Sequence, residues 1–142
     1  MIDLADNEAR HIAMLYRRML RELDRQLAPL GLGPGRYPYL FALYVEDGRS
    51  QQALADAVGT DKAAATRALL RLAADGYVRR EADRADRRVQ RVYLTAKGRR
   101  QRVLLEHAAA HTIAALTAVL APAERSRLRR LLRTLCSAGT AI

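Results

Sequence analysis

The chain has 142 residues, half of them hydrophobic, and a formal net charge of +10. This length fits one packed domain, or one domain with helical extensions, and the positive charge favours a polyanionic partner such as nucleic acid. Arginine supplies nearly all of the charge, because lysine occurs only at Lys62 and Lys97. Arginine suits bidentate contacts to phosphate or guanine, although a compositional bias of the genome explains its excess equally well.

Several classes of protein find no support in the sequence. The first ten residues lack the pattern of a secretory signal. The longest apolar tract, Val103 to Leu120, contains Glu106, His107 and His111, which favours a buried helix over a membrane span. The single cysteine, Cys136, cannot form an internal disulfide, so we expect a reducing, cytoplasmic location. No catalytic grouping and no glycine-rich phosphate loop occurs, so we expect neither an enzyme nor a cofactor.

The N-terminal third predicts two helices. Apolar residues recur at steps of three and four from about Asp6 to Leu27. A second helix is expected from near Pro34 to about Glu46, with Pro38 requiring either a start after Pro34 or a bend. The apolar stripe of the first helix consists of Ile12, Leu15, Tyr16, Met19, Leu20, Leu23 and Leu27.

Two short helices joined by a tight turn follow. Ser50 is a good N-cap for a helix over Gln51 to Ala57, and Gly59 forms the turn. Thr60 is expected to cap a fourth helix from Asp61 to about Asp75. This spacing is typical of a helix–turn–helix. The residues expected to face inward are Ala53, Leu54 and Ala57 on the third helix, and Ala65, Leu69 and Leu72, with Ala68 at the edge, on the fourth.

The stretch from Tyr77 to Gly98 favours a β-hairpin. Its strands are Tyr77 to Arg80 and Val89 to Leu94, and the polar tip between them, Asp83 to Arg88, is rich in arginine. A cationic hairpin after a helix–turn–helix indicates the wing of a winged-helix DNA-binding protein.

Two helices are expected at the C-terminal end. A long helix is predicted from Thr95 to about Leu120, and Pro122 opens a last helix that runs to about Cys136. The first helix and these last two carry more apolar surface than a small winged-helix core can cover, which favours a symmetric homodimer.

The order of these elements resembles the MarR family of bacterial transcription regulators. The wing carries Asp86-x-Arg88 followed by Leu94-Thr95 and Gly98, and Gly76-Tyr77-Val78-Arg79-Arg80 also matches. The recognition-helix match is Asp61-Lys62-Ala-Ala-Ala-Thr66-Arg67. The resemblance covers the chain and implies a mostly α fold with a small β-hairpin wing: a DNA-binding lobe over residues 33–98 and dimerisation helices over 1–32 and 99–142. It also implies a dimer that binds a pseudo-palindromic operator, usually as a repressor, and that a small ligand or an oxidant often releases.

Candidate DNA contacts lie on the fourth helix and the wing. We expect Thr66 and Arg67 to contact bases or phosphate, and Lys62 and Arg71 to contact phosphate. The alanines between them offer only methyl contacts, for example to thymine. On the wing, arginines suit a narrow A·T minor groove, and Asp86 is expected to pair with an arginine and position the wing. The wing arginines are Arg84, Arg87 and Arg88, of which the resemblance favours Arg88.

Sensing functions form a second group of hypotheses. Family members often bind aromatic acids between the DNA-binding lobe and the dimer helices, so a small aromatic or phenolic effector is an expected partner. The lining residues here would be His11, Tyr16, Tyr37 and Phe41, with Arg18 as a carboxylate partner. His107 and His111 lie four residues apart and could face one metal, but no ligand set like that of a zinc-sensing branch accompanies them, so no metal is expected. Cys136 does not match the position of the reactive cysteine in the peroxide-sensing branch.

The sequence thus favours a homodimeric, sequence-specific transcriptional repressor that binds double-stranded DNA. An architectural DNA-binding protein of the same fold is one alternative, because three alanines on the recognition helix offer little sequence discrimination. A metal-responsive regulator that uses His107 and His111 is another.

Overall fold

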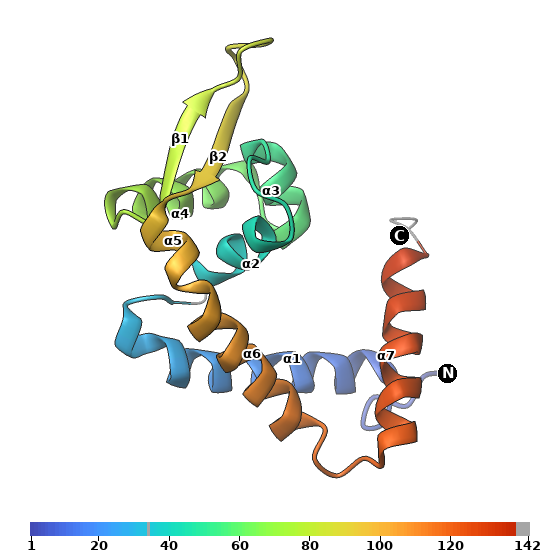
Figure 1. Cartoon of the computed structure of the whole chain (residues 1–142). Coiled ribbons are helices and arrows are strands. Elements are labelled where there is room, and N and C mark those ends of the chain that lie inside the picture. The colour runs from blue at the N-terminus through green and yellow to red at the C-terminus, as the bar shows by residue number, and fades with distance from the viewer. Residues whose placement is uncertain (34, 139–142) are drawn as a thin grey trace.

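The computed structural model describes residues 1–33 and 35–138, and in it a compact lobe stands on a layer of longer helices (Figure 1). The lower layer contains α1 (Glu8–Leu27), which packs against α6 (Arg102–Leu116). Asn7 caps α1 by accepting a hydrogen bond from the backbone N–H of Arg10 at 2.9 Å. None of the described helices combines the length and the apolar character that crossing a membrane requires.

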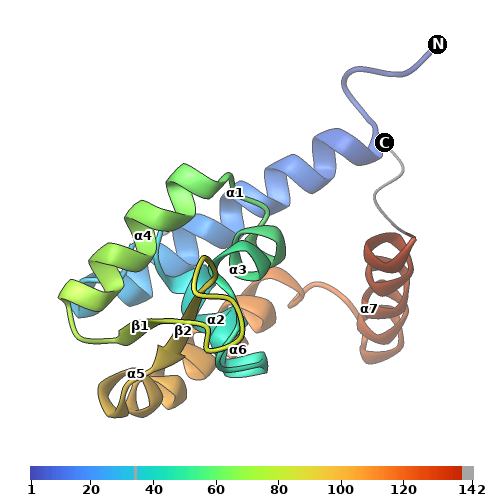
Figure 2. The ribbon, with the colours of Figure 1, turned by 90° about the horizontal axis from the view of Figure 1, so that it is seen from above.

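The apolar stripe predicted for α1 is buried only at its C-terminal end. Leu23 and Leu27 are in the core, whereas Ile12, Leu15 and Tyr16 are exposed. In Figure 2 the N-terminal half of α1 extends beyond the lobe, and none of the other described elements covers it.

The helix α2 (Tyr37–Val45) begins later than the sequence predicted. It follows a short 3-10 turn, η1 (Ala28–Leu30), and the expected start at Pro34 lies outside the described residues. Pro38 requires no bend, because it lies in the first turn of the helix, where backbone N–H groups have no acceptor within the helix.

The helix–turn–helix consists of α3 (Gln51–Val58) and α4 (Lys62–Ala74). The predicted inner face of α4 is confirmed, since Ala65, Leu69 and Leu72 are buried. The prediction for α3 was wrong at Ala53 and Ala57, which are exposed. The residues of α3 turned inward are Leu54 and Ala55, with Val58 half-buried.

The capping prediction for α4 was also wrong by one residue. Asp61 is the N-cap, and its carboxylate accepts a hydrogen bond from the backbone N–H of Ala64 at 2.7 Å. The hydroxyl of Thr60 instead forms a 2.7 Å hydrogen bond with the Tyr39 hydroxyl, which ties the turn to α2.

The hairpin predicted after α4 is present. The strands β1 (Val78–Ala82) and β2 (Gln90–Leu94) are antiparallel, and Val78 lies opposite Leu94. The backbone N–H of Val92 also donates to the carbonyl of Arg49 at 2.9 Å, so the loop after α2 fixes the base of the hairpin. The hairpin projects from the lobe beside α4 (Figure 1).

Between Thr95 and Ala138, the last residue described, the structure contains three helices instead of the predicted two. The expected long helix is divided into α5 (Ala96–Arg100) and α6, and α6 ends at Leu116, not near Leu120. At that end Thr117 is the C-cap, and both its backbone N–H and its hydroxyl donate to the carbonyl of Ile113. The last helix, α7 (Pro122–Ser137), stands apart from the rest of the chain (Figures 1 and 2).

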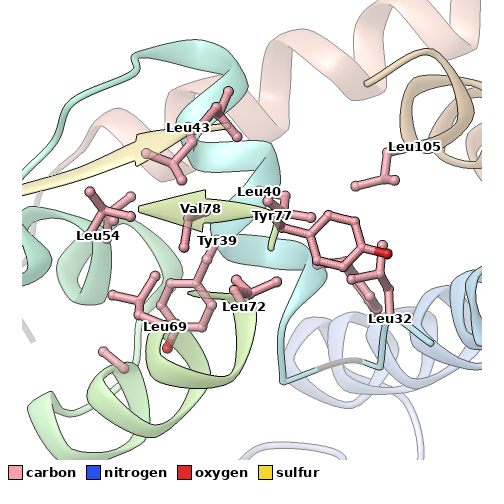
Figure 3. Packing of buried hydrophobic residues seen from close by; sticks show 14 of the residues in the cluster. Leu32, Tyr39, Leu40, Leu43, Leu54, Leu69, Leu72, Tyr77, Val78 and Leu105 are labelled. Carbon is pink, nitrogen blue, oxygen red and sulfur yellow. The ribbon is translucent and has the colours of Figure 1, made fainter. Parts of the chain in front are cut away.

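The core lies between α2, the helix–turn–helix and the base of the wing (Figure 3). Gly98 sits at its edge, where a Cβ atom would lie 2.2 Å from the carbonyl oxygen of Tyr77. The wing, α5 and α4 therefore meet at a fixed angle around this glycine. The buried residues labelled in Figure 3 are Leu32, Tyr39, Leu40, Leu43, Leu54, Leu69, Leu72, Tyr77, Val78 and Leu105.

Candidate nucleic-acid interface

The outer face of α4 carries cations that are free to meet a ligand. Burial of Ala65, Leu69 and Leu72 turns the opposite side of the helix to solvent, since residues three and four apart share a face. Lys62 and Arg67 are exposed, and their side chains have no hydrogen-bond or ion-pair partner among the described residues.

Arg71 is less free. Its Nε atom lies 3.4 Å from the carboxylate of Asp75, which also pairs with Arg36 at 2.7 Å. Asp75 therefore holds Arg71 at the C-terminal end of α4 and links this helix to the segment before α2. The Arg71 side chain remains mostly exposed, so it can still approach phosphate.

Thr66 has its hydroxyl engaged within the protein. This hydroxyl donates to the carbonyl of Lys62 at 2.8 Å and accepts from the Gln51 side chain at 2.5 Å. The same Gln51 side chain accepts from Arg80 of β1 at 3.0 Å. These bonds fix α3, α4 and the wing relative to one another.

At the wing tip, Asp86 and Arg88 form the ion pair that the sequence suggested for Asp86. Two parallel hydrogen bonds of 3.0 Å join the guanidinium to the carboxylate, and the backbone N–H of Arg88 adds a third at 3.1 Å. The pair lowers the pKa of Asp86 and raises that of Arg88. The Arg88 side chain is nevertheless 91% exposed, so it is positioned yet accessible. Arg84 and Arg87 are exposed as well.

Asp83 is a second organiser of the wing that the sequence reasoning missed. Its carboxylate accepts hydrogen bonds from the backbone N–H groups of Ala85 and Asp86, at 2.7 and 3.1 Å, and pairs with Arg91. The Arg91 side chain forms the largest contribution to lowering the pKa of Asp83 to about 2. The sequence feature that could have predicted this role is an aspartate at the first position of a turn. Such a side chain accepts hydrogen bonds from the backbone N–H groups two or three residues further on.

Arg91 connects the wing to the rest of the lobe. Besides pairing with Asp83, it donates to the carbonyl of Gly48 at 3.0 Å. A hollow of about 230 Å³ separates the wing from the start of α4, and its lining includes Lys62 and Arg88. The recognition helix and the wing thus present positive charge toward the same space.

The predicted effector residues are only partly brought together. Tyr37 and Phe41 pack edge to face, with ring centroids 6.1 Å apart. Tyr37 is 2% exposed, and burial raises the pKa of its hydroxyl to about 12, with added effects of Asp24 and Tyr16. The hydroxyl of Tyr37 and one carboxylate oxygen of Asp24 are buried without a hydrogen-bond partner among the described residues.

The other three predicted effector residues lie on the exposed side of α1. Tyr16 is 57% exposed, His11 pairs with Asp6 at 3.4 Å, and Arg18 is exposed.

His107 and His111 do not form part of a metal cluster. His111 lies 3.5 Å from the Glu22 carboxylate and 3.1 Å from the Gln26 side chain, so it joins α6 to α1. Within residues 1–33 and 35–138, no group of three or more His, Cys, Asp or Glu side chains could hold a metal ion.

Comparisons with known proteins agree with this geometry. A model of the MarR family matches residues 30–89. A MarR transcriptional regulator from Methanosarcina mazei Go1 is 32% identical, with a TM-score of 0.88 over 92% of this chain and 94% of that protein. YybA of Bacillus subtilis, described as an uncharacterized HTH-type transcriptional regulator, is 27% identical over 103 residues, 72% of this chain and 69% of YybA.

A third protein shares the fold at lower identity. BpsR of Bordetella bronchiseptica, whose DNA binding is regulated by 6-hydroxynicotinic acid, is 24% identical, with a TM-score of 0.85 over 98% of this chain and 99% of that protein. The likeness to the Methanosarcina regulator extends over nearly the whole of both chains, beyond the lobe that the family model matches. This chain therefore belongs to the MarR family of winged helix–turn–helix transcriptional regulators.

Proposed function

We propose that the protein is a homodimeric repressor that binds a pseudo-palindromic operator. In this proposal α4 enters the major groove, with Lys62, Thr66, Arg67 and Arg71 at the DNA, while the wing arginines reach the adjacent minor groove. The observation that carries it is the pairing of an exposed, cationic recognition helix with a wing whose Arg88 is oriented by Asp86. Positive charge on both elements supplies the sequence-independent part of the affinity.

The exposed apolar surface supports a dimer. It comprises the N-terminal half of α1, the outer side of α6 and the leucine face of α7. A helix the length of α7 is marginal in water without a packing partner, and α7 finds little of one within its own chain. A second copy would cover this surface. The exposed residues concerned are Ile12, Leu15, Tyr16, Val103, Leu104, Ile113, Leu131, Leu132 and Leu135.

A small aromatic ligand is proposed as the signal that releases DNA. The support is the buried Tyr37 hydroxyl and the buried Asp24 oxygen, neither of which has a partner in the described chain, beside the Phe41 ring. Burying polar atoms without hydrogen-bond partners costs free energy, so a ligand that forms hydrogen bonds with them would bind more tightly. BpsR, which shares this fold, responds to a hydroxylated aromatic acid.

Selection of DNA from a random pool tests the first part of the proposal. We expect an enriched palindrome with half-sites about one helical turn apart, and light scattering of the complex should give two chains per duplex. Enrichment without a common sequence would favour an architectural DNA-binding protein. A single chain per duplex would refute the dimer.

Titration with 6-hydroxynicotinic acid tests the effector proposal. The acid should raise the melting temperature of the wild-type protein and weaken its binding to the selected duplex. Tyr37→Phe should reduce both effects. A melting shift that survives unchanged in Tyr37→Phe would place the ligand elsewhere.

A further inference from the structure

The face of α4 that points away from the core is mostly apolar. Ala63, Arg67, Leu70 and Ala74 are all exposed and are spaced by three or four residues, so they form one stripe along the helix. Leu70 is the large apolar member, with 48% of its surface exposed. The stripe lies opposite the buried Leu69 and Leu72 side of the helix.

Few hydrogen-bonding groups accompany this stripe. Arg67 is its only polar member, and it has no partner among the described residues. Thr66, on the flank, has its hydroxyl occupied by Gln51 and by the Lys62 carbonyl. Recognition of bases through the stripe itself therefore depends on one guanidinium and on methyl groups, while the exposed Lys62 and Arg71 flank it.

The position of Leu70 separates it from the apolar surface assigned to the dimer. That surface lies on α1, α6 and α7, whereas α4 is on the far side of the lobe from α7 in both views (Figures 1 and 2). Leu70 instead belongs to the face that carries Arg67 and adjoins Lys62. The exposed surface of Leu70 is therefore continuous with the proposed DNA interface.

The chemistry of the major groove supplies a partner for such a face. Thymine alone among the bases presents a methyl group there, and guanine accepts two hydrogen bonds from an arginine. With a rise of about 1.5 Å per residue, Ala63 lies about 6 Å before Arg67 along the helix axis and Leu70 about 4.5 Å after it. These distances correspond to about one to two base steps of roughly 3.4 Å.

We propose that α4 recognises a thymine-rich half-site, in which Arg67 contacts a guanine and Ala63 and Leu70 contact thymine methyl groups on either side of it. This inference rests on the proposed operator binding and specifies what that binding recognises. It explains how a helix with three consecutive alanines can still discriminate between sequences. Leu70 is then a specificity-determining residue.

Replacing thymine by deoxyuridine tests this directly, because it removes only the C5-methyl group. The probe is the duplex selected from the random pool, with one half-site thymine at a time replaced symmetrically in both half-sites. We expect at least two positions at which the replacement weakens binding by about fourfold per methyl group, the value for burying one such group. Thymines outside the half-sites serve as controls and should have no effect.

A double-mutant cycle with Leu70→Ala assigns the contact. On the unmodified duplex this variant should bind more weakly, and at one thymine position it should lose its sensitivity to deoxyuridine, while its melting temperature stays near that of the wild type. Full sensitivity of Leu70→Ala at every position would refute the role of Leu70. Unchanged affinity of the wild type for all deoxyuridine duplexes would overturn methyl recognition but leave operator binding intact. Failure to select any duplex would overturn the operator proposal and this inference with it.

Discussion

Tyr37 and Tyr39 lie two residues apart on α2 and are equally buried. Among the described residues the Tyr39 hydroxyl has a hydrogen-bond partner, the Thr60 hydroxyl, and the Tyr37 hydroxyl has none. Removing a buried hydroxyl that lacks a partner relieves a desolvation cost, whereas removing one that is bonded loses the bond. We predict that Tyr37→Phe raises the free energy of unfolding by about 1 kcal/mol and that Tyr39→Phe lowers it by about 1 kcal/mol. Urea denaturation of both variants measures the difference. Equal destabilisation by the two substitutions would show that the Tyr37 hydroxyl is bonded in the free protein.

The Asp83–Arg91 pair makes wing stability depend on pH. The folded pKa of Asp83, about 2, is below its ordinary value of 3.8, so its stabilising effect is complete above the unfolded pKa and is lost as the pH falls toward 2. We predict that Asp83→Asn destabilises the protein most above about pH 5, and that the difference from wild type shrinks as the pH is lowered to 2. Denaturation over this pH range measures it.

Arg91→Ala provides the control for this interpretation. Because Arg91 is the main cause of the shift, Asp83→Asn should cost less in the Arg91→Ala background than in the wild type. A cost that is independent of pH and of Arg91 would mean that the backbone hydrogen bonds of the turn, and not the charge, carry the effect.

The interactions of single residues could be predicted where both partners lie close together in the sequence. The pairing of Asp86 with an arginine follows from short sequence spacing. The bond from Thr60 to Tyr39 could not be foreseen, because it joins positions 21 residues apart that only the packing of α2 on the turn brings together.

At the scale of elements, Gly98 controls how the wing, α4 and α5 join. A side chain at this position would meet the backbone carbonyl of Tyr77, which cannot move as a flexible side chain could. We predict that Gly98→Ala lowers the free energy of unfolding by about 3 kcal/mol, at the upper end of the range for overpacking. Gly35→Ala is the matched control, because no atom lies within 4 Å of the added Cβ. Similar denaturation midpoints for the two variants would contradict this role for Gly98.

The wing should contribute to DNA binding more than to stability. The Arg88 side chain is 91% exposed, and its hydrogen bonds and ion pair among the described residues are with Asp86. Exposed ion pairs add little to folding. We predict that Arg88→Ala weakens binding to the selected duplex at least tenfold, about 1.4 kcal/mol, and shifts the melting temperature only slightly. Comparable losses of melting temperature and affinity would show that Arg88 acts through folding alone.

The existence and order of the elements could be predicted, but the faces and ends of the short helices could not. Periodicity over 20 residues identifies α1, whereas the eight residues of α3 fit more than one inner face. The helix α6 ends at Leu116 although the apolar tract continues to Leu120, so the apolar pattern does not reveal this end.

At the scale of the whole molecule, the chain separates a well-packed lobe from an open layer of helices. The lobe encloses its own core around Leu69 and Leu72, while α7 and half of α1 keep their apolar sides exposed. The sequence indicated this excess of apolar surface correctly, because an apolar stripe on a helix is visible in the spacing of residues along that helix alone. How a second copy would cover it depends on contacts between two molecules, which the pattern of one chain does not contain.

Binding to DNA of defined sequence is the central claim, and fluorescence anisotropy measures it most directly. The protein is titrated onto the DNA upstream of its own gene and onto a scrambled duplex of equal composition, over a series of salt concentrations. We predict that specific binding exceeds non-specific binding by more than about a thousandfold, with two chains per site and a steep loss of affinity with salt. Equal affinity for the scrambled duplex would contradict a sequence-specific regulator and favour an architectural DNA-binding protein.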